Sequence, residues 1–228
     1  MRARLIGVIV FAVAGFAVLV ALGSWQVQRL HWKEALLARI EARIAADPVP
    51  LPEDPEPEAD KYLAVRLAGR FTGPVLRIQS AQEGYGAGYH LVQGFDTPAR
   101  RVMIDRGFVP QGAALPEAPE GEVEITGNLL WPDEKDGFTP DPDLATGLFY
   151  ARDVPAMSEV LDTAPLLVVR RDAAGQEGAL MVAPVGTSSI PNDHEGYAIT
   201  WFSLAAIWLV MSGGLIYRIS KQGKGELA

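Results

Sequence analysis

Two long apolar runs lie near the two ends of the chain. The first covers residues 5–28 and the second residues 196–217, and neither contains a charged side chain. About 20 mainly apolar residues are enough for a helix to cross the hydrocarbon core of a bilayer. A helix also satisfies its own backbone hydrogen bonds in lipid. The pattern therefore predicts two transmembrane helices.

Each apolar run has one alternative interpretation. A secretory signal peptide would explain the first run, with Ala21 and Gly23 as the small residues of a cleavage site. That run is longer than the apolar region of about 7–15 residues typical of such signals. A buried core helix would explain the second run, although aromatic and basic residues border it. Transmembrane helices remain the preferred prediction for both runs.

Basic residues on the short flanks predict the orientation. They are Arg2, Arg4, Arg218, Lys221 and Lys224. Positive flanks stay on the cytoplasmic side of a membrane, so the tails at residues 1–4 and 218–228 are predicted to be cytoplasmic. The region between the helices then lies in the periplasm of a bacterium or the intermembrane space of a mitochondrion. We expect an integral protein of the bacterial inner membrane, or of its mitochondrial equivalent, in contact with lipid.

The segment after the first apolar run changes character twice. Leu30, Leu37 and Ile44 recur at heptad spacing, which predicts that the helix continues as a stalk over residues 29–46. Residues 47–60 read DPVPLPEDPEPEAD. Proline denies a helix its backbone donors and favours extended polyproline structure. A stiff acidic linker is the preferred prediction, and a ligand for a proline-binding module is the alternative.

Residues 61–195 are predicted to form an extracytoplasmic β domain. The expected strands are residues 61–71, 75–80, 88–95, 101–109, 121–131, 147–151, 166–171 and 179–185. Turns are expected at residues 72–74 and 96–98. In the run at 121–131, Ile125 and Leu129 would face the core and Asn128 would face outward, because side chains alternate along a strand.

One short helix is expected over residues 154–161, with Asp153 as its cap and Pro155 in its first turn. Several short, mostly hairpin-linked strands with one helix are typical of an antiparallel sheet curled into a small barrel or sandwich. The predicted fold class is therefore a membrane-anchored α+β protein. Two transmembrane helices would flank this β domain.

Composition and missing motifs narrow the function. The chain has 20 Lys and Arg against 28 Asp and Glu, a formal charge of −8, which disfavours a nucleic-acid partner. It has no cysteine, which excludes disulfides, thiolate nucleophiles and iron–sulfur clusters. The catalytic patterns GxSxG, HExxH, GxxxxGK[ST] and GxGxxG are absent. No residue is picked out for catalysis, so we expect a protein that is not an enzyme.

Two triplets at the outer ends of the membrane helices are the candidate site. They are Trp25, Arg29 and Trp32 on the first helix and His194, Tyr197 and Trp201 on the second. Spacings of three and four place each triplet on one helix face. An imidazole, flat apolar walls and a cation for a propionate are the parts of a haem site. The alternative is an aromatic belt with a capping histidine. Structural roles are favoured for His31 and His90.

Five segments share a resemblance that covers nearly the whole chain. They read LGSWQVQRLHWK at 22–33, GRF at 69–71, GYHLVQGF at 88–95, DRGFVP at 105–110 and DHEGYAITWFSLA at 193–205. The chain resembles the SURF1 (Surfeit locus 1) family of cytochrome oxidase assembly proteins. Three positions depart from the family pattern: Asp193 stands where asparagine is usual, Gly94 where proline is usual and Phe108 where tryptophan is usual.

The resemblance implies an assembly factor for haem–copper terminal oxidases that helps haem a to reach the catalytic subunit. It implies that His194 is a candidate ligand of the haem a iron, and that Trp25, Gln26, Arg29 and Tyr197 are motif positions. The expected partners are the oxidase catalytic subunit and enzymes of haem a synthesis. Two alternatives stay open: a cofactor-free structural chaperone, and an accessory membrane subunit of a respiratory oxidase complex.

Overall fold

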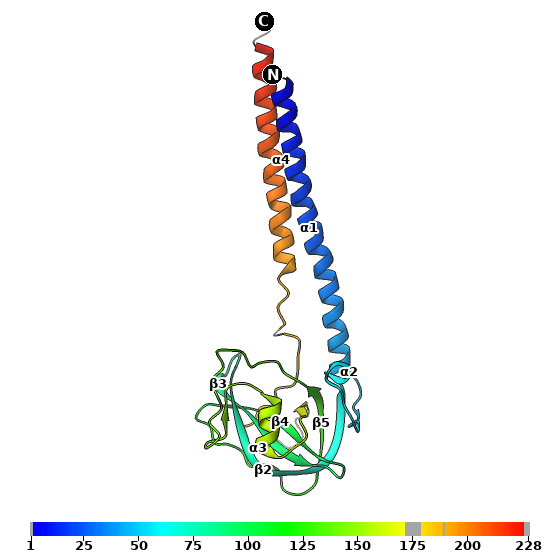
Figure 1. The fold of residues 1–228 in the computed structure, drawn as a ribbon, viewed down its shortest axis with the longest axis vertical. Coiled ribbons are helices and arrows are strands. Elements are labelled where there is room, and N and C mark those ends of the chain that lie inside the picture. The colour runs from blue at the N-terminus through cyan, green and yellow to red at the C-terminus, as the bar shows by residue number, and fades with distance from the viewer. Residues whose placement is uncertain (1, 172–178, 189, 226–228) are drawn as a thin grey trace. The chain divides into compact units, whose positions relative to one another are not determined.

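The computed structural model describes residues 2–171, 179–188 and 190–225 and divides the chain into two compact units. One unit contains Met1–Arg39 and Ser188–Ala228, and the other contains Ile40–Thr187. The first unit is helical and the second is built around a β-sheet (Figure 1). The ends of both expected cytoplasmic tails, residue 1 and residues 226–228, lie outside the described residues.

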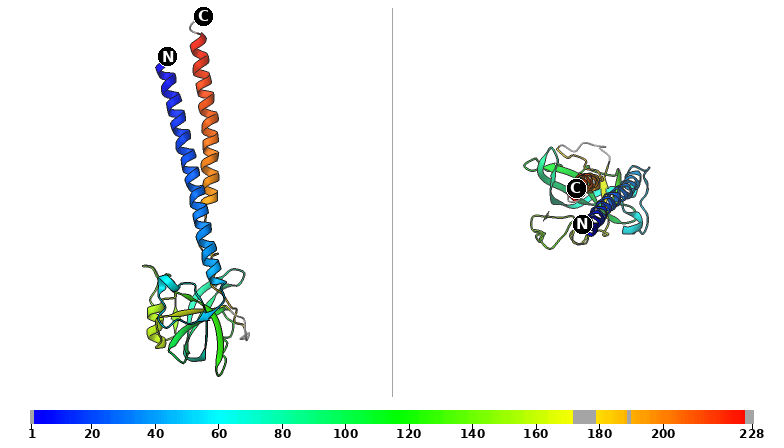
Figure 2. Two further views of the ribbon diagram at one scale, coloured as in Figure 1. Left: turned by 90° about the vertical axis from the view of Figure 1, so that its right-hand side faces the viewer. Right: turned by 90° about the horizontal axis from the view of Figure 1, so that it is seen from above.

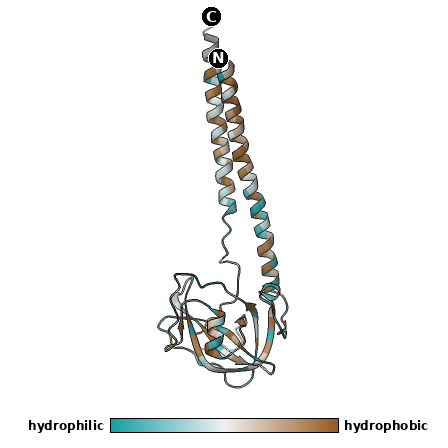
Figure 3. Ribbon diagram, viewed as in Figure 1, coloured by the Kyte–Doolittle hydropathy of each residue, from teal (hydrophilic) through white to brown (hydrophobic). Residues whose placement is uncertain are grey.

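The helical unit contains two long apolar helices, as the hydrophobic pattern predicts. They are α1 (Arg2–Ile44), whose last residues belong to the other unit, and α4 (His194–Gly225). Both are long and apolar enough to cross a membrane, and only 6% of the most apolar window of each is buried. Apolar residues are frequent along α4 and along the N-terminal part of α1 (Figure 3), and many of their side chains are exposed.

The two helices run side by side and contact each other through small residues opposite aromatic rings (Figure 2). A Cβ atom added at Gly15 would lie 2.5 Å from Cζ2 of Trp208, and one added at Gly23 would lie 2.8 Å from Cε1 of Phe202. The indole N–H of Trp208 donates a 2.8 Å hydrogen bond to the carbonyl oxygen of Ala12. Close approach at glycine is the usual way for apolar helices to gain packing contacts.

The second unit contains a seven-stranded sheet in the order β1-β2-β3-β4-β7-β5, with β6 paired to β2 and an additional β2–β5 pairing. Its strands are β1 (Val49–Pro50), β2 (Ala64–Gln82), β3 (Gly86–Asp96), β4 (Arg101–Pro110), β5 (Val123–Leu130), β6 (Leu148–Phe149) and β7 (Leu167–Arg170). Its helices are α2 (Pro57–Asp60) and α3 (Val154–Leu161).

The sheet is mixed, so the prediction of an antiparallel sheet is wrong. Three pairings are parallel, namely β1–β2, β2–β6 and β4–β7. A parallel pair needs a long connection between its strands. The chain between β4 and β7 provides one, because it passes through β5, β6 and α3.

The turn expected at residues 72–74 is also wrong. The chain continues through these residues as the single strand β2, which pairs with β3 on both sides of a register shift between Thr72 and Val75. Gly73 has a φ of +73° there, a value that favours glycine. Pro74 has no N–H to donate, and a bulge is one of the few places where a strand accepts proline. The turn at residues 96–98 is confirmed, because β3 and β4 pair as far as Asp96 and Arg101.

Residues 179–185 form no strand. Their one pairing is an isolated bridge in which Met181 and Phe108 exchange two backbone hydrogen bonds of 2.8 Å. Proline has no N–H to donate to a strand pairing. Pro184 lies three residues after Met181, so it does not favour a longer strand there. Residues 172–178 and residue 189, which fall within the predicted β domain, lie outside the described residues.

Residues 47–60 make contacts with the sheet instead of forming only an extended spacer. Val49 and Pro50 pair with Val65 and Arg66 of β2. Arg100 donates hydrogen bonds to the carbonyl oxygens of Pro52 and Glu53. Extended proline-rich chain has no internal hydrogen bonds, so its free carbonyl groups are available to arginine side chains of the sheet.

Two buried apolar clusters form the core of the sheet unit. One contains Met157 and Leu161 of α3 together with Leu76 and Val92, and the other is centred on Phe95 and Ile104. The helix predicted over residues 154–161 is confirmed, as is its cap: the backbone N–H of Ala156 donates a 3.2 Å hydrogen bond to Asp153.

The alternation of β5 predicts that Asn128 faces outward, and this prediction is wrong. The side chain is fully buried, with 0% exposure. Its side-chain amide donates hydrogen bonds of 3.0 Å to the carbonyl of Ile44 and 3.1 Å to the carbonyl of Tyr62. Arg171 also donates to the carbonyl of Ile44, at 2.9 Å. The last carbonyls of a helix have no partner within it, so Asn128 and Arg171 satisfy the end of α1.

Candidate functional site

His194 and Gln26 form the one hydrogen bond between two side chains that joins α1 to α4 among the described residues. His194 Nδ1 lies 2.8 Å from Gln26 Oε1. Gln26 follows Gly23 by three residues, so it lies on the face of α1 that packs against α4. It is only 8% exposed, and its amide therefore depends on this contact for a protein partner.

The hydrogen bond leaves the other ring nitrogen of His194 available. Within residues 2–171, 179–188 and 190–225, no hydrogen bond or ion pair engages Nε2. His194 begins α4 and is only partly buried. A neutral imidazole with a proton on Nδ1 presents a lone pair at Nε2, which is a common ligand for transition metals.

The triplet on α1 lies on a neighbouring face of that helix. Successive helix residues are rotated by about 100°, so Trp25 points to a different side from Gln26. Trp25, Arg29 and Trp32 share that side, and the guanidinium carbon of Arg29 lies 4.4 Å from the ring centroid of Trp32. Both tryptophans are about half exposed. They offer flat apolar surface beside a cation.

The triplet on α4 divides between two faces. Trp201 is seven residues after His194 and seven before Trp208, so it lies on the face that contacts α1, and it is partly buried. Tyr197 is 57% exposed. In the described part of the chain, no hydrogen bond or ring contact joins the α1 triplet to Tyr197 or Trp201.

The structure thus joins His194 to Gln26, and Arg29 to Trp32, in two separate contacts. The sequence predicts Arg29 as the cation of the His194 site, and the resemblance implies a motif position for Gln26 without assigning it a role. One signal could have indicated Gln26: it is an amide on the helix face that also carries Gly15 and Gly23.

The sheet unit contains a second histidine site, and its chemistry is different. His90 Nδ1 lies 3.0 Å from one oxygen of Asp105 and 3.2 Å from the other. Arg152 lies 3.6 Å from Asp105 and donates a 2.9 Å hydrogen bond to Glu134. These four residues connect β3, β4 and the start of α3 to the loop after β5.

Charges within this cluster shift two pKa values. Burial alone would raise the pKa of the Glu134 carboxyl, but the hydrogen bond and charge of Arg152 outweigh it, and the net shift is downward. Burial would lower the pKa of Arg152, but Glu134 and Asp105 together raise it. Both groups are therefore held in their charged forms. Among the described residues, no three His, Asp or Glu side chains are grouped as a metal site.

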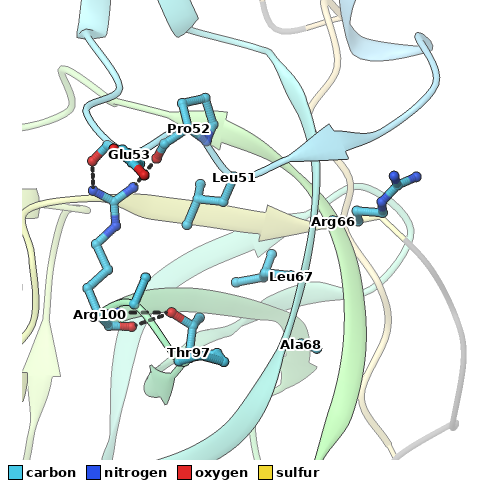
Figure 4. Close-up of a pocket in the computed structure, with 10 residues that line it drawn as sticks. Leu51, Pro52, Glu53, Arg66, Leu67, Ala68, Thr97 and Arg100 are labelled. Carbon is cyan, nitrogen blue, oxygen red and sulfur yellow. Dashed lines mark hydrogen bonds between the residues drawn. The ribbon is translucent and has the colours of Figure 1, made fainter.

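A pocket of about 550 Å³ also lies in the sheet unit, beside β1 and β2. Leu51 and Leu67 face each other across it, and Arg100 borders it with its guanidinium group on the carbonyls of Pro52 and Glu53 (Figure 4). Its lining contains no histidine, methionine or tyrosine. The pocket therefore offers no ligand for a haem iron, and the candidate site remains at His194.

The fold and site define the class of protein: a mixed-sheet unit combined with a pair of long apolar helices joined by a histidine–glutamine hydrogen bond. The model of the SURF1 family matches residues 13–206, which include both Gln26 and His194. The chain belongs to the SURF1 family.

Three relatives illustrate the similarity. Surfeit locus protein 1 of Rattus norvegicus is 30% identical over 211 residues, which cover 81% of this chain and 68% of the rat protein. The Homo sapiens protein of the same name is 29% identical, with coverage of 81% and 69%. The SURF1-like protein of Drosophila melanogaster is 30% identical, also with coverage of 81% and 69%.

Proposed function

We propose that this protein is a membrane-anchored assembly factor for a haem–copper terminal oxidase, which holds haem a through His194 and presents it to the catalytic subunit. Membership of the SURF1 family implies a role in cytochrome oxidase assembly. The observation that supports the haem-specific part is the hydrogen bond between His194 Nδ1 and Gln26, because it leaves Nε2 as a free ligand.

The residues at the helix ends fit the chemical parts of haem a. His194 would supply one nitrogen ligand, the exposed rings of Trp25 and Trp32 would supply apolar surface, and Arg29 would supply a cation for a propionate. When bound, the iron supplies a Lewis-acidic centre that accepts the imidazole lone pair. One protein ligand suits a transfer function, because only one metal bond must break on release. The chain acts by binding and presentation, without catalysis.

Exposed apolar side chains support membrane anchoring by α1 and α4. Nearly the whole apolar window of each helix is unburied, and water would make such a surface unfavourable. Basic residues at both ends of the chain favour cytoplasmic termini. The sheet unit then lies on the outer side, in the periplasm of a bacterium. The pairings from β2 through β3, β4, β7 and β5 return to β2, which supports a small closed barrel.

The proposed partners follow from this role. The oxidase catalytic subunit receives the cofactor, and enzymes of haem a synthesis supply it. Contact with these membrane partners would use the half-exposed rings of Trp25 and Trp32 on α1.

Absorption spectroscopy tests the proposal. The full chain, purified in detergent from cells that make haem a, is expected to show a Soret band. His194→Ala should remove most of this band, whereas His31→Ala, a change at an exposed histidine of α1, should leave it intact. Unchanged haem affinity and spectrum in His194→Ala would show that His194 is not the ligand. Stable co-purification with the catalytic subunit, without pigment in haem-replete cells, would instead support a cofactor-free chaperone.

A further inference from the structure

Gln26 has a buried side chain whose hydrogen-bond partner among the described residues is the imidazole of His194. We propose that Gln26 is a positioning residue: it accepts the proton of His194 Nδ1 and so fixes the tautomer that presents Nε2 to a metal. This inference rests on the proposed function for its consequence, the binding of haem. The tautomer itself is a property of the ligand-free protein.

A neutral imidazole has a fixed proton count. The ring carries one N–H and one lone pair. Gln26 Oε1 lies 2.8 Å from His194 Nδ1, and a carbonyl oxygen can only accept a hydrogen bond. With the amide in this orientation, the proton lies on Nδ1. Partners of this kind fix the orientation of metal-binding histidines and increase their basicity.

Packing around Gln26 supports a fixed geometry. Three residues earlier, Gly23 lies so close to the ring of Phe202 that an added Cβ would be 2.8 Å from it. Ala198, one turn after His194, is also buried. Close contact of the two helices on this face limits the rotamers of both side chains. The amide thus holds the ring, and the exposed side of the helix end remains open to a ligand.

A comparison with His90 explains why the acceptor is an amide. His90 faces the carboxylate of Asp105, which carries a negative charge. Gln26 offers an acceptor without a charge, so it holds the ring without favouring an imidazolium ion. An imidazolium has no lone pair to give to a metal. A neutral acceptor therefore suits a ligand that binds and releases iron.

The opposite orientation of the amide makes the inference testable. If the Gln26 side chain were turned, its NH₂ group would donate to Nδ1 and the proton of His194 would lie on Nε2. That tautomer cannot ligate through Nε2 without rearrangement. The two orientations place the proton on different ring nitrogens of His194, so the ¹⁵N signals of Nδ1 and Nε2 distinguish them.

The experiment uses the full chain with ¹⁵N-labelled histidine in detergent micelles and without haem. His194 signals are assigned by their loss in His194→Ala. We expect the Nδ1–H tautomer in the unmodified chain and a shift toward Nε2–H in Gln26→Met. Gln26→Glu, which keeps an acceptor oxygen, should retain Nδ1–H. Gln28→Met is the matched control, because Gln28 is exposed on the same helix.

Titration with haemin measures the consequence. Gln26→Met should weaken binding by about 10–100-fold, the usual effect of removing the partner of a metal-binding histidine. Gln26→Glu should recover only part of the affinity, because its carboxylate keeps an acceptor for Nδ1–H but also favours the imidazolium ion, which has no lone pair. Gln28→Met should leave the affinity unchanged. A merely structural contact would not produce recovery together with the matching tautomer.

Three results separate the possible failures. An Nε2–H tautomer in the unmodified chain, or an unchanged tautomer in Gln26→Met, overturns the role of Gln26. Equal loss of haemin affinity in Gln26→Met and Gln26→Glu with Nδ1–H retained in both also overturns it. Normal haemin binding in His194→Ala overturns the proposed function, while the nitrogen spectra still decide what Gln26 does.

Discussion

The molecule contains two histidines whose Nδ1 atoms contact a partly or fully buried side chain, and their surroundings differ. His90 lies in the sheet unit against Asp105, which has 0% exposure and also contacts Arg152. His194 lies in the helical unit against the neutral amide of Gln26, and no described residue contacts its other nitrogen. At the His90 site the charged side chains contact one another, whereas at the His194 site Nε2 has no partner among the described residues.

The two histidine contacts differ in how far protein stability explains them. Buried charges are costly unless each one has a partner, so the cluster around Asp105 is explained by the stability of the sheet unit. A single amide–imidazole hydrogen bond between apolar helices gives little stability, about 0.6 kcal/mol on average in a membrane protein. Stability therefore gives little reason for the contact between Gln26 and His194, which the proposed ligand-binding role would explain.

The largest expected effect is at the centre of the charged cluster. Asp105→Ala would leave His90 and the backbone N–H of Gly107 without their carboxylate partner, and Arg152 with Glu134 alone. We expect the sheet unit to lose about 3–5 kcal/mol of stability, the range for breaking a buried ion pair. Thermal unfolding followed by circular dichroism measures the loss.

Asp141→Ala is the control for that change, because Asp141 is exposed in the same unit and should cost less than about 0.5 kcal/mol. If Asp105→Ala were as stable as Asp141→Ala, the contrast between the two histidine sites would be lost.

A smaller effect is expected at the helix contact. Gly23→Val would place new atoms against the ring of Phe202, where even a Cβ would lie 2.8 Å away. Overpacking of this kind costs about 1–3 kcal/mol. It should weaken association of the two helices and lengthen the contact between Gln26 and His194, one turn further along. Cross-linking of α1 to α4 measures the association.

The matched control is Gly7→Val, since an added Cβ at Gly7 meets nothing within 4 Å. Both changes should leave the unfolding temperature of the sheet unit unaltered. A lower unfolding temperature of the sheet unit in Gly23→Val would mean that the two histidine sites are not energetically separate.

Much of this arrangement could be predicted from the sequence, for local reasons. The apolar runs of α1 and α4 are long and uncharged, and α3 has its capping aspartate and early proline. Such patterns involve only residues that are close together in the sequence. The helix-end position of His194 could also be predicted, because it borders an apolar run.

The rest depends on contacts that no local pattern contains. The parallel pairing of β4 with β7 joins strands that are distant in the sequence. Asn128 is buried because the end of α1 requires donors, a need that the alternation of β5 does not reveal. Gln26 was missed as the partner of His194 for the same reason: 168 positions separate the two residues.

The smallest expected effect concerns the rim of the charged cluster, and it depends on pH. Glu134 has a pKa below its ordinary value of 4.5 because the Arg152 hydrogen bond and charge outweigh burial. A depressed pKa adds stability that is fully present above the ordinary value and is lost as the pH falls through the folded value. Glu134 is more than a third exposed, so solvent screening limits the contribution to about 0.2–1 kcal/mol.

Glu134→Gln should therefore destabilise the sheet unit slightly at neutral pH and not at pH values well below 4.5. Unfolding at several pH values measures this, with Glu159→Gln on the exposed side of α3 as the control. An equal loss at both ends of the pH range would mean that Glu134 stabilises by packing, and the charged cluster would then end at Arg152.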